Sequence, residues 1–334
     1  MLRVTYDEMK GEFLRVLLKK GLNAGLAGIN AELFAQNSLD GIYTHGLNRF
    51  PAVMDKIDEG YINVNEVASF ECGFAAMERW NGNLGMGPSN AKMCMTRAVE
   101  LAGQYGVGCV ALRNTSHWMR GGAYGLLAAD MGCVGICFTN TTPNMPAWGG
   151  VNPRVGNNPF IVAIPRADGF HVMLDMAVSQ YSYGAVEKAA RGGYMLPVPG
   201  GYDRDGNLTS DPNLLWESRR MLPVGFWKGS CMSIVLDLLA AGLSGGNTVE
   251  DIGRLPAEMS CSQFFMAINP AKIGDPDYLE RIAQSTIDYI KTSVPESEGD
   301  VIYYPNEMSY DTRADNLANG IPADEGFWNM VKSM

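Results

Sequence analysis

The sequence is poor in histidine and lacks the short motifs that mark most metal and nucleotide sites. Only His45, His117 and His171 occur in 334 residues, without HxxxH or HxH spacing, and the seven cysteines form no CxxC pair. A GxSxG motif, a phosphate-binding P-loop and a GxGxxG after a strand are also missing. These absences argue against a metal enzyme, a serine hydrolase, a P-loop protein and Rossmann-type dinucleotide binding.

Positive charge and long apolar runs are also scarce. Lysine and arginine together number 26 against 36 aspartates and glutamates, a formal charge of −10, which disfavours nucleic acid and anionic membranes as partners. The longest apolar run, residues 233–243, is too short for a membrane span and contains Asp237. Residues 5–10 resemble a capped helix start and not a signal peptide, and the scattered cysteines indicate reduced thiols, so we expect a cytoplasmic protein.

The remaining pattern is that of a folded α/β protein. Hydrophobic residues make up 46% and charged residues 19% of the chain, with 39 glycines and 17 prolines spread along it, which excludes disorder. Helices are predicted over residues 5–20, 24–38, 50–60, 122–130, 182–190, 228–244 and 276–292, through Lys92, Met95 and Val99, and in a polar tail from 309 onward. Strands are predicted over residues 67–71, 75–80, 107–112, 133–139, 160–165, 172–176 and 263–268, and a surface loop over 199–212. Because strand–helix units alternate with adjacent strands, we expect a mixed sheet and not an all-parallel one.

Two of the three histidines lie in similar polar clusters. His45 is followed closely by Arg49, and His117 by Arg120. An arginine fork can hold a carboxylate while an imidazole delivers a proton to a carbonyl oxygen, so the combination suits reduction of a 2-oxo acid. The alternative is that these histidines are loop residues with satisfied hydrogen bonds and that the arginines are solvated. His171, at the start of a predicted strand, is better explained as a structural residue.

Six motifs, in order along the chain, are similar to those of the malate/L-lactate dehydrogenase family. They are DGIYTHGLNR at 40–49, NTSH at 114–117, PAWGG at 146–150, GNNP at 156–159, LDMA at 174–177 and KGS at 228–230. The resemblance spans nearly the whole chain. It implies a nicotinamide-dependent reductase of 2-oxo acids on a non-Rossmann mixed α/β fold, with NAD as cofactor or NADP as the alternative. It also implies a homodimer with the cofactor near the subunit boundary.

The resemblance also implies roles for individual residues. The proton donor falls on His45, and Asp175 is our candidate for an acidic partner that favours the charged imidazole. The expected catalytic set is His45, Arg49, His117, Arg120 and Asp175. The expected cofactor contacts are His171, Val172, Met173, Leu174, Asp175, Met176 and Ala177 in one strand, Trp227 and Lys228 at a helix start, and Asn306 and Glu307 in a late loop that is one residue shorter than in the family. No metal is expected.

Arg120 is the residue on which we base the expected substrate. Beside Trp118, its guanidinium would meet the additional hydroxyl and keto oxygens of a sugar-derived 2-oxo acid, whereas a lactate pocket would leave it unpaired. A malate-, lactate- or ureidoglycolate-type enzyme and a structural ion pair of Arg120 are the alternatives. A binding protein that merely kept the fold would be expected to lose His45, Arg49 or Lys228, and all three are present.

No long linker divides the chain, so any two parts should share segments from both termini. We expect residues 1–70 together with 255–334 to form a mainly helical part that contributes substrate and dimer contacts. Residues 71–254 should form the mixed-sheet part that binds the cofactor.

Overall fold

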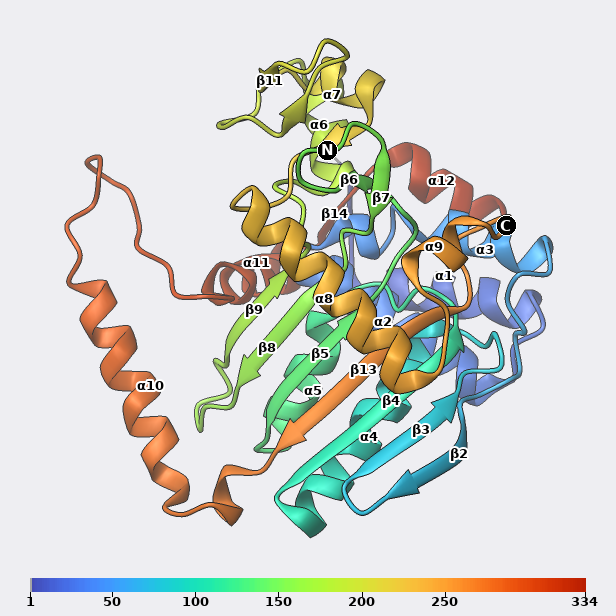
Figure 1. Ribbon diagram of the computed structural model, residues 1–334, viewed down its shortest axis with the longest axis vertical. Helices are drawn as coiled ribbons and strands as arrows, with labels where there is room; N and C mark the ends of the chain where they lie inside the picture. The colour runs from blue at the N-terminus through green and yellow to red at the C-terminus, as the bar shows by residue number, and fades with distance from the viewer. Residues whose placement is uncertain (1) are drawn as a thin grey trace.

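A seven-stranded sheet forms the centre of the computed structural model, which describes residues 2–334 (Figure 1). Across the sheet the strands are β2 (Ser69–Phe74), β3 (Met77–Asn81), β4 (Val107–Thr115), β13 (Cys261–Ile268), β5 (Val134–Thr139), β8 (Phe160–Ile164) and β9 (Val172–Met176). Only β3 and β4 pair in parallel, and the other neighbours are antiparallel. The predicted α/β class with a mixed sheet is therefore confirmed.

Helices cover both faces of this sheet. Helices α4 (Gly87–Tyr105) and α5 (Gly122–Asp130) lie behind it in Figure 1, and α8 (Trp227–Ser244) crosses in front. Alternate residues of a strand point to opposite faces, so Phe265 packs in the core under α4 and α5, while Phe264 packs in the core under α8. The sheet thus separates two apolar cores, one on each face.

A third core joins the two ends of the chain. It lies among α1 (Tyr6–Lys19), α2 (Ala24–Leu39), α3 (Phe50–Asp58) and α12 (Glu325–Ser333), and β1 (Leu2–Val4) pairs antiparallel with β14 (Ile321–Ala323). At its centre the Phe13 and Phe50 rings stack with centroids 4.2 Å apart, and Phe34 meets Phe50 edge-on. This helical layer supports the loop that carries His45.

The remaining elements are short or peripheral. They are η1 (Tyr43–His45), β6 (Met145–Pro146), β7 (Pro153–Val155), α6 (Tyr183–Gly192), β10 (Gly201–Tyr202), β11 (Leu208–Thr209), α7 (Pro212–Ser218), β12 (Arg220–Met221), α9 (Val249–Gly253), η2 (Pro270–Lys272), α10 (Pro276–Lys291) and α11 (Glu307–Asn319). The predicted loop over 199–212 therefore contains two short strands, and the polar tail contains β14. No helix within residues 2–334 is long and apolar enough to cross a membrane.

One predicted boundary needs correction. Residues 255–334 were assigned to the helical part, yet β13 lies within them and forms the central strand of the sheet. Its residues are almost all buried, because strands on both sides and helices on both faces enclose it. The sheet therefore draws on both segments of the chain.

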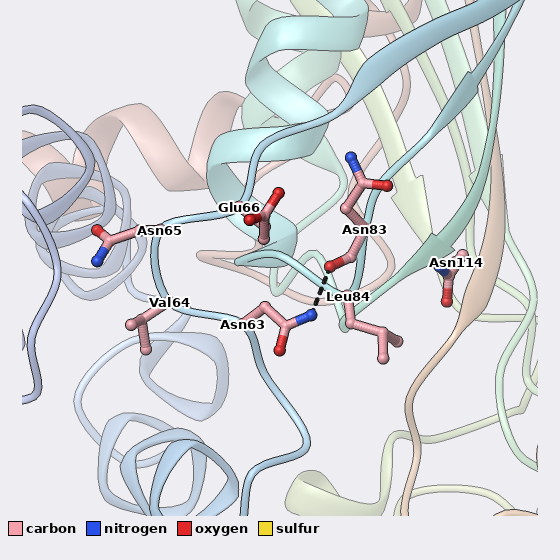
Figure 2. A pocket seen from close by; sticks show the side chains of 7 residues that line it. All are labelled: Asn63, Val64, Asn65, Glu66, Asn83, Leu84 and Asn114. Atoms are coloured by element: carbon pink, nitrogen blue, oxygen red, sulfur yellow. Dashed lines mark hydrogen bonds between the residues drawn. The ribbon is translucent and has the colours of Figure 1, made fainter.

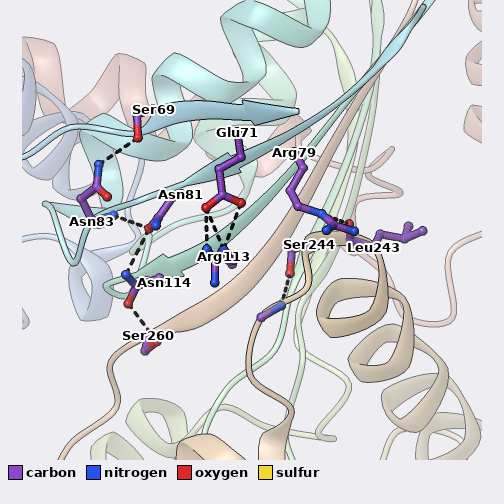
Figure 3. A network of polar contacts seen from close by, with 11 residues as sticks. Ser69, Glu71, Arg79, Asn81, Asn83, Arg113, Asn114, Leu243, Ser244 and Ser260 are labelled. Atoms are coloured by element: carbon purple, nitrogen blue, oxygen red, sulfur yellow. Dashed lines mark hydrogen bonds and ion pairs between the residues drawn. The ribbon is translucent and has the colours of Figure 1, made fainter. Parts of the chain in front are cut away.

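Polar contacts fasten the β2–β3 edge to its neighbours (Figure 3). The Arg113 guanidinium of β4 binds the Glu71 carboxylate of β2, with Nε 3.1 Å from each carboxylate oxygen. Arg79 Nε of β3 donates to the Leu243 carbonyl of α8 at 3.2 Å. Because the arginines reach from different strands, the edge hairpin is held to both the sheet and α8.

Candidate active site

His45 is placed by the short turn η1 between α2 and α3. Gly46 lies so close to α2 that a Cβ there would collide with Ser38 Oγ, so the turn needs glycine at this position. His45 Nδ1 lies 3.2 Å from Thr44 Oγ1. Within the described residues Nε2 is therefore the ring nitrogen left for a substrate.

His117 is placed by the end of β4. The neighbouring Ser116 Oγ accepts a hydrogen bond from Gly87 N at 2.7 Å, which fixes this segment against α4. Met119 N donates to His117 Nδ1 at 2.9 Å, so a neutral His117 carries its proton on Nε2. The His45 and His117 rings stack, with centroids 5.9 Å apart and an interplanar angle of 21°. Two segments distant in sequence thus bring both predicted imidazoles together.

Two cations lie beside His117, namely Arg49, which directly precedes α3, and Lys56 in the last turn of that helix. Arg49 and Lys56 line an enclosed cavity of about 10 Å³ with His117, which is room for about one water molecule. Arg49 Nη2 lies 3.7 Å from Glu258 Oε2, and Lys56 Nζ donates to the Glu258 carbonyl at 3.1 Å. Sequence reasoning missed Lys56 and Glu258. Lys56 follows Arg49 by two helical turns on the same face, a pattern that could have revealed it, whereas no local pattern connects Glu258 to the site.

Burial and neighbouring cations keep both imidazoles neutral. The pKa of His45 falls from its ordinary 6.5 to about 3, first because the surrounding protein desolvates the half-buried ring and then because of His117, Arg49 and Arg120. The pKa of His117 falls well below its ordinary value, again chiefly through burial and then through Arg49 and Lys56. The free protein therefore holds a pair of uncharged imidazoles among fixed positive charges.

The predicted partnership between Asp175 and His45 is wrong. Among the groups that shift the pKa of His45, the carboxylate that favours its charged form is that of Glu258. Asp175 Oδ2 instead accepts from Gly122 N at 3.1 Å and lies 3.5 Å from Arg120 Nε. Desolvation raises the pKa of Asp175, although Arg120 and Gly122 oppose this shift.

Arg120 does not have the free guanidinium expected of a substrate contact. Its Nη1 donates to Asp40 Oδ2, its Nε faces Asp175, and only 3% of its side chain is exposed. Asp40 is also bound by Arg313 Nη1, at 2.6 Å from Oδ1. Trp118 is buried in the core under α4 and α5, so its side chain is likewise not free to contact a substrate. The structure thus favours the alternative of a structural ion pair at Arg120.

Strand β9 is the edge strand of the sheet, which suits a strand expected to lie along a cofactor. It carries the predicted contacts Val172, Met173, Leu174, Asp175 and Met176, with Ala177 directly after it. Met173 N donates to the Pro305 carbonyl at 3.1 Å, so this peptide group faces away from β8. Because peptide groups alternate in direction, those of Asp175 face the same edge.

The His171 side chain is not available to a cofactor. Its Nδ1 accepts from Arg166 N at 2.9 Å, and its Nε2 lies 2.9 Å from Asp130 Oδ1. The ring is 4% exposed. Its side chain therefore has the structural role that its sequence context indicated, and a cofactor contact through this ring is not supported.

The other predicted cofactor residues lie near the two ends of β9. Val224 N, just before α8, donates to the Val178 carbonyl at 2.8 Å, which sets the exposed Trp227 and Lys228 beside the carboxyl end of the strand. Asn306 lies in the loop that binds Met173 and has a buried Nδ2 without a hydrogen-bond partner among the described residues.

Glu307, in contrast, is already occupied. Its Oε2 lies 2.6 Å from Lys291 Nζ and accepts from Tyr304 N at 3.0 Å. The carboxylate therefore braces the late loop, so a direct cofactor contact from Glu307 is not supported.

A wider, open groove of about 610 Å³ lies between the segment after α3 and the turn before α4 (Figure 2). It is lined by Asn63, Val64, Asn65, Glu66, Asn83, Leu84 and Asn114. Asn63 Nδ2 donates to the Asn83 carbonyl at 2.9 Å, and Asn114 Nδ2 donates to Asn81 Oδ1 at 3.1 Å, so these amides brace the loops. None of the predicted site residues lines this groove.

Comparisons with known proteins identify the family of this chain. The profile of the malate/L-lactate dehydrogenase family matches residues 4–332. A protein of Escherichia coli O17:K52:H18 named 2,3-diketo-L-gulonate reductase is 41% identical over 334 residues, with 100% of both chains covered. Malate dehydrogenase from Entamoeba histolytica superposes with a TM-score of 0.93 at 28% identity, covering 99% of this chain and 96% of that chain. Sulfolactate dehydrogenase from Methanocaldococcus jannaschii does so with a TM-score of 0.91 at 28% identity, with the same coverage. The chain therefore belongs to the malate/L-lactate dehydrogenase family.

Proposed function

We propose that this protein reduces 2,3-diketo-L-gulonate to 3-dehydro-L-gulonate with a reduced nicotinamide cofactor. The observation that carries the proposal is the meeting of two imidazoles, 5.9 Å apart, with the cations of α3. Such a centre can bind an anionic 2-oxo acid and protonate its carbonyl oxygen. The full-length likeness to a relative named for this substrate supports the choice of oxo acid.

Arg49 and His117 bind and orient the substrate in this proposal. Arg49 stands 3.7 Å from its carboxylate neighbour Glu258, a loose pairing that leaves the guanidinium able to hold a substrate carboxylate through two hydrogen bonds. His117 donates from Nε2, because its Nδ1 already accepts from Met119 N. A neutral imidazole can polarise a carbonyl in this way without giving up its proton.

His45 supplies the proton. It is neutral in the free protein, and an anionic substrate beside Arg49 offsets the positive charge that lowers the pKa of His45, so binding favours uptake of a proton. The reduced nicotinamide, when bound, supplies hydride to the carbonyl carbon. His45 then gives its proton to the carbonyl oxygen, which completes the 2-hydroxy acid and leaves the imidazole neutral.

The residues along β9 fit a nicotinamide cofactor. On the edge of β9 that faces away from β8, Met173 N is bound to Pro305, and the peptide groups of Asp175 can serve a ligand. Lys228 places an exposed ammonium in the first turn of α8, where the helix also favours anions. The buried, unpartnered Nδ2 of Asn306 is a donor that a ligand could satisfy. We propose Lys228, the β9 backbone and Asn306 as the groups that hold NADH or NADPH.

A second candidate is the reduction of a 2-oxo dicarboxylate such as oxaloacetate. It is favoured by Lys56, a second cation beside Arg49 whose hydrogen bond in the described chain goes to a neutral carbonyl. Oxidation of NADH and of NADPH should be followed with 2,3-diketo-L-gulonate, oxaloacetate and pyruvate. The proposal predicts the highest kcat/KM for 2,3-diketo-L-gulonate, and a preference for oxaloacetate would support the second candidate.

We also propose that two copies of this chain form a homodimer through α8. The outward face of α8 is apolar and exposed, with Val235 at 52% and Leu238 at 63% exposure. Such a stripe on a helix that already covers the sheet suits a second apolar face. Sedimentation should give a dimer for the wild type and a monomer for Leu238→Asp, and a wild-type monomer would contradict the proposal.

The seven cysteines are all unpaired, as expected of a protein in a reducing compartment, so we retain cytoplasmic location as a proposal.

A further inference from the structure

We propose that Arg120 and Asp40 are positioning residues, which clamp the loop that carries His45 to the strand that lies along the cofactor. This inference rests on the proposed function, because it concerns the placement of the proton donor against the nicotinamide. It replaces the substrate contact that the sequence predicted for Arg120.

The clamp is a chain of charges that crosses three elements. Asp40 caps the end of α2, shortly before His45, and accepts from Arg120 Nη1. Arg120 stands before α5 and turns its Nε toward Asp175 of β9, at 3.5 Å. One guanidinium thereby faces a carboxylate on the His45 side and another on the cofactor side.

The residues around Arg120 and Asp175 hold the two side chains in this arrangement. Gly122 N donates to Asp175 Oδ2 at 3.1 Å, and a Cβ at Gly122 would collide with that same oxygen. The start of α5 therefore needs glycine for the carboxylate to approach its backbone. Arg120 is 4% exposed, so its charge depends on these two carboxylates for compensation.

The ionic connection has a consequence for catalysis. The rigid, planar guanidinium of Arg120 donates to Asp40 through Nη1 and faces Asp175 through Nε as an ion pair, so it lies between the two carboxylates and restrains their separation. His45 follows Asp40 through a single short turn, and Asp175 belongs to the open edge of β9. A loss of the clamp should therefore misplace the imidazole relative to the cofactor for every substrate, since small displacements of reacting groups are costly.

The chain offers a matched control for this idea. Arg313 of α11 binds the other oxygen of Asp40, at 2.6 Å, but has no contact with Asp175 within the described residues. Arg313→Met thus removes an ion pair from Asp40 without breaking the connection to β9. Arg120→Met breaks that connection, and Asp40→Asn weakens it with little change of volume.

The experiment measures NADH affinity by fluorescence titration, together with kcat for 2,3-diketo-L-gulonate and for pyruvate, on the full-length wild type and variants. Arg120→Met should weaken NADH binding about tenfold and lower kcat for both oxo acids by the same factor, on the order of tenfold or more. Asp40→Asn should lower both kcat values as well, and the double variant should be no worse than Arg120→Met alone. Arg313→Met should stay within about twofold of the wild type.

Three results would overturn the clamp. They are a loss confined to 2,3-diketo-L-gulonate with pyruvate unchanged, additive effects of Asp40→Asn and Arg120→Met, or an equal loss in Arg313→Met. If Arg120→Met does not fold, the comparison of Asp40→Asn with Arg313→Met still separates a variant that weakens the connection to β9 from one that leaves it intact. A wild type that binds NADH but reduces no 2-oxo acid would refute the proposed function, while the NADH affinities would still test the clamp.

Discussion

Acidification should destabilise this protein through His45, because the folded site holds that imidazole neutral. The pKa of His45 is about 3 in the folded protein against 6.5 ordinarily, so below pH 6.5 the unfolded chain binds a proton that the folded chain does not. Stability contributed by the neutral form is therefore present above pH 6.5 and is lost as the pH falls toward 3. The slope is about 1.4 kcal/mol per pH unit, which gives roughly 2 kcal/mol between pH 7 and pH 5.

Urea unfolding at pH 7 and pH 5 measures this loss directly. His45→Gln keeps a polar side chain that does not titrate, so its free energy of unfolding should fall by about 2 kcal/mol less than that of the wild type over this interval. His117→Gln should act in the same direction, because the pKa of His117 is also lowered well below its ordinary value. An identical acid sensitivity of wild type and His45→Gln would refute the reasoning that the site keeps His45 neutral.

Three further predictions concern ligands. Binding of a 2-oxo acid should be accompanied by proton uptake at neutral pH, because the substrate carboxylate offsets the charge of Arg49 and raises the pKa of His45 from about 3. Calorimetry in buffers of different ionisation enthalpy should detect this uptake. Its absence would contradict the role of His45. Lys56→Met should raise KM for oxaloacetate about tenfold and leave KM for pyruvate within about twofold. Equal increases for both substrates would show that Lys56 does not bind the second carboxylate of oxaloacetate. Lys228→Ala should raise KM for the nicotinamide cofactor about tenfold, with little change for the oxo acid, and equal increases would argue against its placement on the cofactor.

Elements with a clear local sequence signal were predictable from the sequence. Helix α5 and strand β9 have the predicted bounds, because a small-residue helix between turn signals and a short apolar strand each have a local pattern. The pairing of β1 with β14 was missed, since three-residue strands from opposite ends of the chain carry no local signal. The central place of β13 was also missed, because strand order is fixed by packing across the whole sheet.

The candidate site shows the same division. Motifs located His45, Arg49 and His117, and the structure brings these three together. The ion pairs of Arg120 were not predictable, because they join residues that are distant in sequence and depend on the tertiary fold. The lowered pKa of His45 likewise follows from burial and from cations on several elements, which a motif does not describe.

The central claim is that His45 donates the proton in the reduction of a 2-oxo acid. Its most direct test is the kcat of His45→Ala with 2,3-diketo-L-gulonate at saturating NADH or NADPH, alongside cofactor affinity measured by fluorescence. The account predicts a loss of kcat on the order of 100-fold or more with cofactor affinity unchanged, because a general acid commonly contributes that much. A variant that retains near-normal kcat would contradict the account.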